Sequence, residues 1–329
     1  MTPPLPMKVL FQVKFLRWIG LGIGVGLFVW LLLRSDLPAV LLLLLDFRWR
    51  FAIVLAFYVV IFGLDTWGWK FALRPAMRRI PWRLLFRARL AGEAINYVTP
   101  TAWIGGEPVK AVLLAERHGI PITEGMASVV VAKTTFALSM LLFILLGLGV
   151  ALATQPLSAS LLRWVWIVLP ILGFLLGLFL LVQFFQPFGR TASLLRRWRP
   201  SWFERVGAKL KAWDEAVVSF YRQSPHSVLW SLGFHFLGWI AGALEVCMIL
   251  WLLGIPVSLP TAVSIEALWV LLKSGTFLIP ASLGVSEGIG LLVCVGLGIS
   301  SVAGLALGLI RRARELTWVG LGLIEVARR

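Results

Sequence analysis

Two short segments of this very apolar chain combine prolines, glycines and charged side chains. The first is N-Y-V-T-P-T-A-W-I-G-G-E-P-V-K, and the second is I-P-A-S-L-G-V-S-E-G. In both, a glutamate follows a proline by seven positions: Glu107 follows Pro100, and Glu287 follows Pro280. Proline and glycine leave backbone groups without helical partners, and lipid cannot satisfy them. Such backbone is tolerated at membrane depth only against protein or a water-filled cavity, so the segments predict a polar site inside the protein.

Charged side chains recur at these segments and inside the apolar stretches that follow them. A charge at the bilayer centre costs about 2.5–3.5 kcal/mol on insertion scales, so each is expected to face a partner or water. The candidate residues for a lipid-headgroup site are Asn96, Pro100, Gly105, Gly106, Glu107, Lys110, Lys133, Pro280, Gly284, Glu287, Arg311, Arg312 and Arg314. Weaker candidates, more typical of contacts between helices, are Asp65, Glu93, His235, Glu245, Glu266 and Lys273.

The stronger candidates have two interpretations. In the first, Glu107 pairs with Lys110 or Lys133, Glu287 pairs with Arg311 or Arg314, and Arg311 pairs with Glu315 four positions later. Buried pairs of this kind can serve only to fix the fold. In the second, the charges belong to a binding site, in which each glutamate holds a cation of the span that follows it: Lys133, or one of the arginines at positions 311, 312 and 314. Basic residues outnumber acidic residues in the set, so positive charge would remain after pairing. Beside the N-termini of half-helices, that surplus would attract an anionic group such as a phosphate.

The composition identifies the class of protein in which these residues lie. Of 329 residues, 60% are hydrophobic and 14% are charged, and the mean hydropathy is +0.92. A soluble domain has roughly 25% charged residues, so the chain is predicted to be an integral membrane protein. The net charge of +16 is consistent with basic loops that face the cytoplasm and anionic lipid, rather than with a nucleic-acid partner.

Hydrophobic segment lengths predict an all-α polytopic fold. A helix needs roughly 20 apolar residues to cross a bilayer. Segments of that length lie at about 15–33, 51–73, 122–151, 161–185, 228–253 and 301–326. Shorter apolar pieces at 84–115 and 262–296 are each divided by a proline, which predicts two re-entrant hairpins of half-helices. The prediction is therefore about six full spans and two re-entrant hairpins.

Basic side chains favour one orientation for these spans. They gather near the N-terminus, at 74–89, at 190–222 and at the C-terminus, which predicts that all four lie in the cytoplasm. The first hairpin would then enter from the cytoplasm and the second from outside. Residues 1–329 would form a single transmembrane domain, with 51–153 and 228–326 as inverted repeats. A bacterial-type inner membrane is the expected location.

The segment between the predicted repeats, residues 190–224, carries a separate prediction. Trp202, Trp213 and Phe220 fall on one helical face, opposite a basic face. This pattern predicts an amphipathic helix on the cytoplasmic surface, with its apolar face in the lipid.

Motifs for nucleotide, metal or acyl chemistry are not found in the sequence. It has no P-loop, HExxH motif, zinc-type Cys/His spacing or GxSxG elbow. Cys247 and Cys294 sit in apolar segments and are expected to be small buried side chains. We therefore expect no catalytic residue, no metal and no cofactor.

The residues quoted above resemble a known family. Asn96, Pro100, the Gly-Gly-Glu sequence and Lys110, together with the proline–glutamate echo near the C-terminus, are similar to the flippase-like transmembrane family. That family includes the membrane half of lysylphosphatidylglycerol synthases. The Thr-Pro-Thr and Gly-Gly-Glu-Pro motifs are most similar to its hopanoid-associated branch. The resemblance implies movement of a lipid or lipid-linked molecule between leaflets. The soluble aminoacyl-transferring domain is absent, so lysyl transfer is not implied. Many relatives have an acidic–basic pair where this chain has Ala132-Lys133.

Three functions are compatible with the sequence. The first is a translocator that moves an anionic or isoprenoid-type lipid through a polar site at mid-membrane, with membrane lipids as partners. The second is a non-catalytic subunit of a lipid (hopanoid-type) biosynthesis complex, in which the mid-depth charges are structural. The third is a membrane-embedded enzyme acting on lipid, with Glu107 or Glu287 as general base.

Overall fold

The computed structural model describes residues 22, 24–34, 36–99, 105–155, 157–184, 215–276 and 282–328. Across these residues the chain forms helices and no strands. The principal helices are α2 (Leu37–Phe47), α3 (Phe51–Ala72), α4 (Trp82–Val98), α5 (Glu107–His118), α6 (Ile122–Thr154), α7 (Ala159–Phe184), α10 (Pro225–Leu252), α11 (Leu259–Ser274), α12 (Val285–Gly296) and α13 (Ser301–Ala327).

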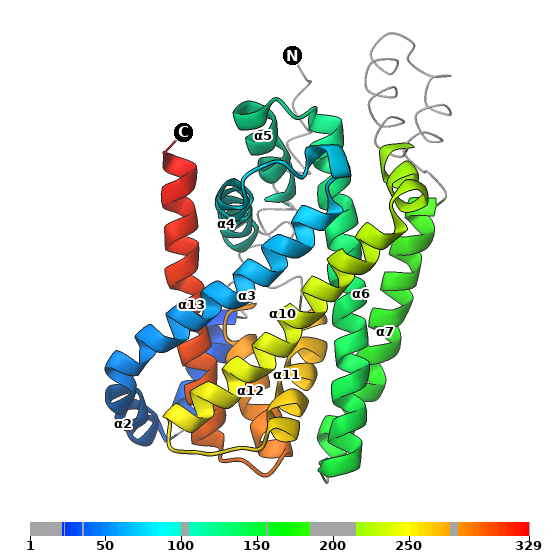
Figure 1. Cartoon of the computed structure of the whole chain (residues 1–329). Coiled ribbons are helices and arrows are strands. Elements are labelled where there is room, and N and C mark those ends of the chain that lie inside the picture. The colour runs from blue at the N-terminus through cyan, green and yellow to red at the C-terminus, as the bar shows by residue number, and fades with distance from the viewer. Residues whose placement is uncertain are drawn as a thin grey trace, which may run out of the picture.

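The helices form an elongated bundle, and the two predicted hairpins lie toward opposite ends of it. Figure 1 shows α4 and α5 in the upper part, near the C-terminus, and α11 and α12 in the lower part. Helices α3 and α10 pack against each other obliquely across the middle, while α6 and α13 run along the length of the bundle. Helix α6 packs against α11, and α13 packs against α4, so each long helix reaches the hairpin of the other half.

Local sequence signals explain where the half-helices begin and end. Helix α5 has a proline in its first turn and ends at Gly119, whose φ of 65° is the left-handed conformation that glycine adopts without strain. Helix α11 begins after Ser258, whose hydroxyl accepts the backbone N–H of Thr261. Ser300 caps α13 in the same way. These caps satisfy backbone donors that would otherwise be left open inside an apolar environment.

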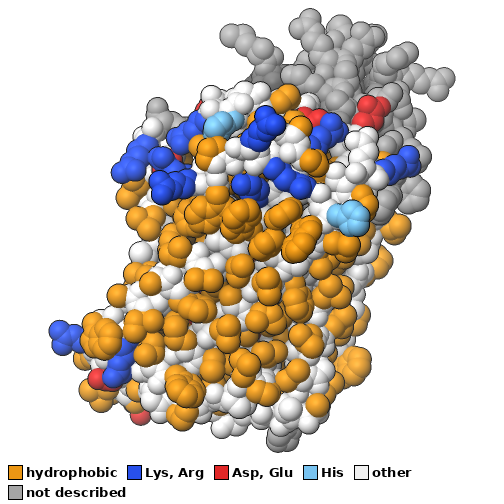
Figure 2. Space-filling model, in the orientation of Figure 1, with side chains coloured by type: hydrophobic (Ala, Val, Ile, Leu, Met, Phe, Trp, Pro, Cys, Tyr) orange, Lys and Arg blue, Asp and Glu red, His pale blue; other side chains and the backbone are white. Residues whose placement is uncertain are grey.

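Among the described residues, three helices are long and apolar enough to cross a membrane by themselves: Ile122–Thr154, Ala159–Leu181 and Pro225–Leu252. A fourth candidate is the bent pair Gly24–Arg34 and Leu37–Ala72, whose two parts meet at 97°. On the face shown in Figure 2, apolar side chains cover the middle and lower part, and Lys and Arg gather above them. The chain is therefore an all-α membrane protein. The count of six spans and the re-entrant character of the hairpins stay predictions.

Two apolar clusters leave a polar zone between them. One contains Trp69 of α3 and Val131 of α6, and the other contains Val54 of α3 and Ile144 of α6. On α3 the buried Asp65 lies between the two clusters, and on α6 Lys133 does. The two charged side chains, Asp65 and Lys133, therefore lie between the two apolar clusters. Cys294 is buried and Cys247 half-buried, and both are free thiols.

The linker prediction is wrong at Phe220. Residues 215–223 are helical, and Ala216, Val217 and Phe220 are buried in the apolar cluster that includes Leu85 and Leu114. The apolar face of this part is therefore buried in protein instead of lipid, in a cluster that also contains residues of α3 and α6. Trp202 and Trp213 lie outside the described residues.

Candidate functional site

A cavity of about 440 Å³ lies between the two hairpins, and its wall includes residues from both halves of the chain. That volume is within the range of roughly 300–1,000 Å³ typical of small-molecule sites. The acidic side chains in the wall are Asp65, Glu93, Glu107, Glu245, Glu266 and Glu315. The basic side chains are Arg89, Lys110, Lys133, Lys273, Arg311 and Arg314.

In the first half, the carboxylate of Glu107 joins three helices. Glu107 is the first residue of α5, and it is buried. Its Oε1 lies 2.9 Å from Nζ of Lys133 on α6, and its Oε2 lies 3.1 Å from Nζ of Lys110. Lys110 also reaches Glu93 of α4, at 2.7 Å. The carboxylate of Glu107 additionally lies in the first turn of α5, where the helix dipole stabilises negative charge.

Asn96 fixes the turn between the two half-helices. Its side-chain Nδ2 donates to Glu107 Oε1 at 3.1 Å, and its Oδ1 accepts the backbone N–H of Gly106 at 2.7 Å. The end of α4 therefore orients the start of α5. The two half-helices also approach at the backbone, because a Cβ on Gly106 would lie 1.8 Å from the carbonyl oxygen of Gly92. Only glycine at position 106 permits this separation.

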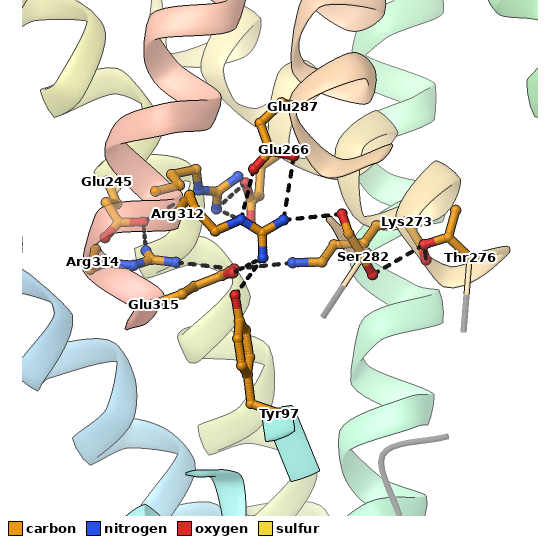
Figure 3. A network of polar contacts seen from close by, with 11 residues as sticks. Tyr97, Glu245, Glu266, Lys273, Thr276, Ser282, Glu287, Arg312, Arg314 and Glu315 are labelled. Carbon is orange, nitrogen blue, oxygen red and sulfur yellow. Dashed lines mark hydrogen bonds and ion pairs between the residues drawn. The ribbon is translucent and has the colours of Figure 1, made fainter. Parts of the chain in front are cut away.

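In the second half, Arg312 is the centre of an equivalent network (Figure 3). Its Nε donates to Glu287 Oε1 at 2.7 Å, and its Nη2 donates to the carbonyl of Ser282 at 3.0 Å. Its Nη1 donates to the hydroxyl of Tyr97, the penultimate residue of α4, and lies 3.5 Å from Glu315 Oε2. Arg312 therefore connects the second hairpin to the first. Gly284 stands at the N-terminal cap of α12, with a φ of 73° that favours glycine.

The other two arginines of α13 bind acidic residues of α10 and α11. Arg311 lies 2.7 Å from Glu266 and 3.6 Å from Glu245. Arg314 is hydrogen-bonded to Glu245. Of the three arginines that the sequence offered as partners of Glu287, the structure selects Arg312, because α13 turns the side chains of Arg311 and Arg314 toward other helices.

A family model described as the lysylphosphatidylglycerol synthase transmembrane region matches residues 17–323 of the chain. The chain belongs to this family. It is also 26% identical, over 275 residues, to a UPF0104 membrane protein of Methanothermobacter thermautotrophicus, with 79% of each chain covered. No solved structure gives a significant match. The family resemblance is confirmed, whereas the hopanoid-associated branch stays a prediction.

The candidate residues of this lysylphosphatidylglycerol synthase-type transmembrane region divide into two groups. Those that line the cavity are Glu107, Lys110, Lys133, Arg311 and Arg314. Those outside its described lining are Asn96, Gly105, Gly106, Gly284, Glu287 and Arg312. Asn96 is hydrogen-bonded to Glu107 and Arg312 to Tyr97, and both of these partners line the cavity. Gly106 is hydrogen-bonded to Asn96. Pro100 and Pro280 lie outside the described residues. The structure thus brings candidates from both halves to one cavity.

The expected surplus of positive charge is wrong for the cavity wall. The wall carries equal numbers of acidic and basic residues, and the Glu287–Arg312 pair beside it is balanced as well. The acids missing from the sequence-based count are Glu315 and four of the weaker candidates, Asp65, Glu93, Glu245 and Glu266, all of which line the cavity. Their helices turn them inward, and sequence position alone did not distinguish this from ordinary helix–helix contact.

Arg89 of this family member was assigned by the sequence to the cytoplasmic basic cluster, and that assignment is wrong. Its guanidinium lies 3.0 Å from Asp65 Oδ2 in the cavity wall. A signal was present, because Arg89, Glu93 and Asn96 are spaced four and three residues apart and share one face of α4. No comparable signal pointed to Tyr97, since its role depends on a contact between the two halves.

Proposed function

We propose that this protein moves an anionic or isoprenoid-type lipid between leaflets, with the headgroup passing through the cavity and the tails remaining in lipid. One observation carries the proposal: a single charged cavity is built from both predicted hairpins and from the long helix that follows each. A protein that only spans the membrane, or only anchors another protein to it, does not need twelve Asp, Glu, Lys and Arg side chains around a cavity, because each of these charges requires a partner to be tolerated there.

The pairing around Glu107 suits exchange with a phosphate. Lys133 is 34% exposed, which makes it one of the least buried charged side chains of the wall, whereas Glu107 is buried. A headgroup phosphate that approaches Lys133 competes with Glu107 for the same ammonium group. Lys110 keeps Glu93 as a second partner, so the site remains paired while Lys133 binds the headgroup.

The inverted repeat and the membrane topology are part of the same proposal. Helices α6 and α13 each follow a hairpin, and each packs against the first half-helix of the other hairpin. Both contacts use a glycine: Gly147 of α6 lies against Ala267, and Gly322 of α13 lies against Ala94. Lys133 and Arg312 each lie eleven residues after the first residue of their helix. These features support two halves of opposite orientation, with six spans, two re-entrant hairpins and cytoplasmic termini.

The test is translocation of tail-labelled lipids in proteoliposomes by variants that remove charge but keep size. Glu107→Gln should remain folded, because Lys110 retains Glu93 and Lys133 is partly exposed. It should lose lipid movement, since an amide does not hold Lys133 as a carboxylate does, and Glu287→Gln should lose it also. Glu116→Gln, on the exposed face of α5, is the matched control and should move lipid as the unmodified protein does.

The same experiment separates the competing functions. If Glu107→Gln and Glu287→Gln lower thermal stability but leave translocation per folded molecule normal, the ion pairs are structural. That outcome would reject the translocation site and favour a non-catalytic subunit of a lipid-biosynthesis complex. Conversion of the lipid to a new product in the same vesicles would favour an enzyme instead.

A further inference from the structure

His235 occupies an unusual position in the cavity wall. It lies near the middle of α10 and is 1% exposed. Its Nδ1 is 3.0 Å from Oδ1 of Asp65 on α3, and the other carboxylate oxygen of Asp65 is 3.0 Å from Arg89 on α4. The second ring nitrogen, Nε2, is buried and has no hydrogen-bond partner within the described parts of the chain. A buried polar atom without a partner in a charged cavity requires an explanation, and an imidazole nitrogen in this position can accept a proton.

A glycine on each helix allows the His235–Asp65 pair to form at the contact between α3 and α10. A Cβ on Gly68 of α3 would lie 2.6 Å from the imidazole ring, and a Cβ on Gly238 of α10 would lie 2.9 Å from Asp65 Oδ1. Each helix therefore carries its ionisable residue three positions before a glycine, and each glycine makes room for the residue of the other helix. The arrangement fixes the imidazole at the crossing of α3 and α10, where the two halves of the chain meet.

The groups around His235 come from five helices. Helix α3 contributes Asp65, which favours a positive imidazole. Helices α4 and α5 contribute the cations Arg89 and Lys110 to the same cavity wall. Helix α6 contributes the ring of Phe136, packed edge-on at 5.3 Å, and Lys133 lies on the same helix less than one turn away. Helix α10 itself contributes Glu245 to the wall, and this carboxylate is bound to Arg311 and Arg314.

The charge balance of the wall gives His235 a distinct role. The acidic and basic side chains of the wall are equal in number and are bound to one another. Among the side chains lining the described cavity, His235 is the one whose ordinary titration falls between pH 5 and 8. One proton on its ring changes the wall from neutral to singly positive. The wall then offers the charge that an anionic headgroup requires and that the fixed residues do not supply.

We propose that His235 takes up one proton together with the anionic headgroup of a lipid, so that the protein moves a lipid anion and a proton as a unit. The cations Arg89 and Lys110 lie in the same cavity wall as His235. A phosphate in the cavity adds an anion beside Asp65 and offsets the repulsion that these cations exert on a positive imidazole. By linkage, headgroup binding raises proton affinity, and protonation raises headgroup affinity by the same factor. The proton comes from water on the side of entry and returns to water when the headgroup leaves.

This inference rests on the proposed translocation function, and two measurements keep the two claims distinguishable. The first is calorimetric binding of short-chain phosphatidylglycerol to the detergent-solubilised protein in two buffers that differ in ionisation enthalpy. The unmodified protein should take up a measurable fraction of a proton per lipid at pH 7.5, which approaches one at the upper end of the typical site–site coupling of roughly 5–150-fold. His235→Gln, which can still donate a hydrogen bond to Asp65, should bind without proton uptake. His226→Gln, an exposed position on the same helix, is the matched control.

The second measurement is translocation of tail-labelled phosphatidylglycerol in vesicles that contain a pH dye. Lipid movement by the unmodified protein should change the internal pH, and its rate should fall at least about fivefold between pH 6 and pH 8, the low end of typical coupling. His235→Gln, or His235→Asn if the first variant does not fold, should move lipid at a rate independent of pH. Labelled phosphatidylcholine should carry no proton with it.

The outcomes divide cleanly. Translocation without proton uptake, with equal pH profiles for the unmodified protein and His235→Gln, overturns the coupling and leaves the proposed function standing. Neither binding nor translocation of phosphatidylglycerol at any pH overturns both. Uptake of inorganic phosphate with a proton, in vesicles where no lipid moves, would make the ligand a free anion and overturn the lipid assignment.

Discussion

Replacing Gly106 by alanine tests the backbone contact that positions Glu107. Gly106 precedes α5 with φ −84° and ψ −10°, a conformation that alanine adopts without strain. The effect of the added methyl group is therefore purely one of space. Its Cβ would lie 1.8 Å from the carbonyl oxygen of Gly92, and Cβ contacts under 3.0 Å essentially never occur. The atoms nearest the added Cβ belong to the backbone of Gly92, so no side-chain rotation can relieve the clash.

The magnitude follows from that geometry. Helix α5 has to move away from α4 by about 1.2 Å to bring the contact from 1.8 to 3.0 Å. Overpacking a well-packed site costs roughly 1–3 kcal/mol, and a contact between two backbones lies at the upper end, about 3 kcal/mol. The same movement weakens the hydrogen bond from Gly106 to Asn96, which is worth roughly 1 kcal/mol. The two contributions amount to about 3–4 kcal/mol, so at roughly 2–4 °C per kcal/mol the melting midpoint should fall by about 6–16 °C.

The assay is thermal unfolding in detergent, with Gly149→Ala as the matched control. Gly149 lies in α6 with no atom within 4 Å of an added Cβ, so this change should be neutral or stabilise by up to about 1 kcal/mol. Gly106→Ala should also lose lipid translocation, because Glu107 moves with α5 and leaves Lys133. If the two alanine variants melt within about 2 °C of each other, less than the shift expected for 1 kcal/mol, the close approach of α4 and α5 is refuted.

The remaining predictions concern a buried ion pair and the orientation in the membrane. Glu245→Gln should destabilise the protein by roughly 3–5 kcal/mol, because Arg314 is buried and its other carboxylate, that of Glu315, is 3.9 Å away; thermal unfolding beside Glu107→Gln checks this, and equal melting of the two variants would contradict it. Reporter fusions at Gln155 should report outside and fusions at His118 inside, since basic residues gather near His118. The same side for both fusions would contradict the proposed orientation.

Helix positions were largely predictable from the sequence because the signals are local. The break predicted at Pro100 separates α4, which ends at Val98, from α5, which begins at Glu107. The long span predicted at 122–151 is α6, which extends three residues further. Apolar length, proline and glycine each act within a few residues, so one sequence is sufficient to place them.

Side-chain partners were predictable only where the choice was small. Glu107 had two nearby lysines, and it binds both. Glu287 had three arginines within four positions, and the choice of Arg312 depends on the rotation of α13 against α12. Phe220 was misplaced for a related reason: its apolar face is evident from the sequence, but whether that face meets lipid or protein depends on how the other helices pack around it.

The two carboxylate–cation pairs occupy equivalent positions in the proposed repeat but differ in exposure. Lys133 is 34% exposed beside Glu107, whereas Arg312 is 8% exposed beside Glu287 and is also bonded to Ser282 and Tyr97. In the proposed function, this difference leaves the first pair accessible to a headgroup while the second pair stays closed. The contact that helps to close the second pair is made by Tyr97, near the end of α4. A movement of α4 against α13 would break this contact, so the proposal couples the opening of the second pair to the position of the first hairpin.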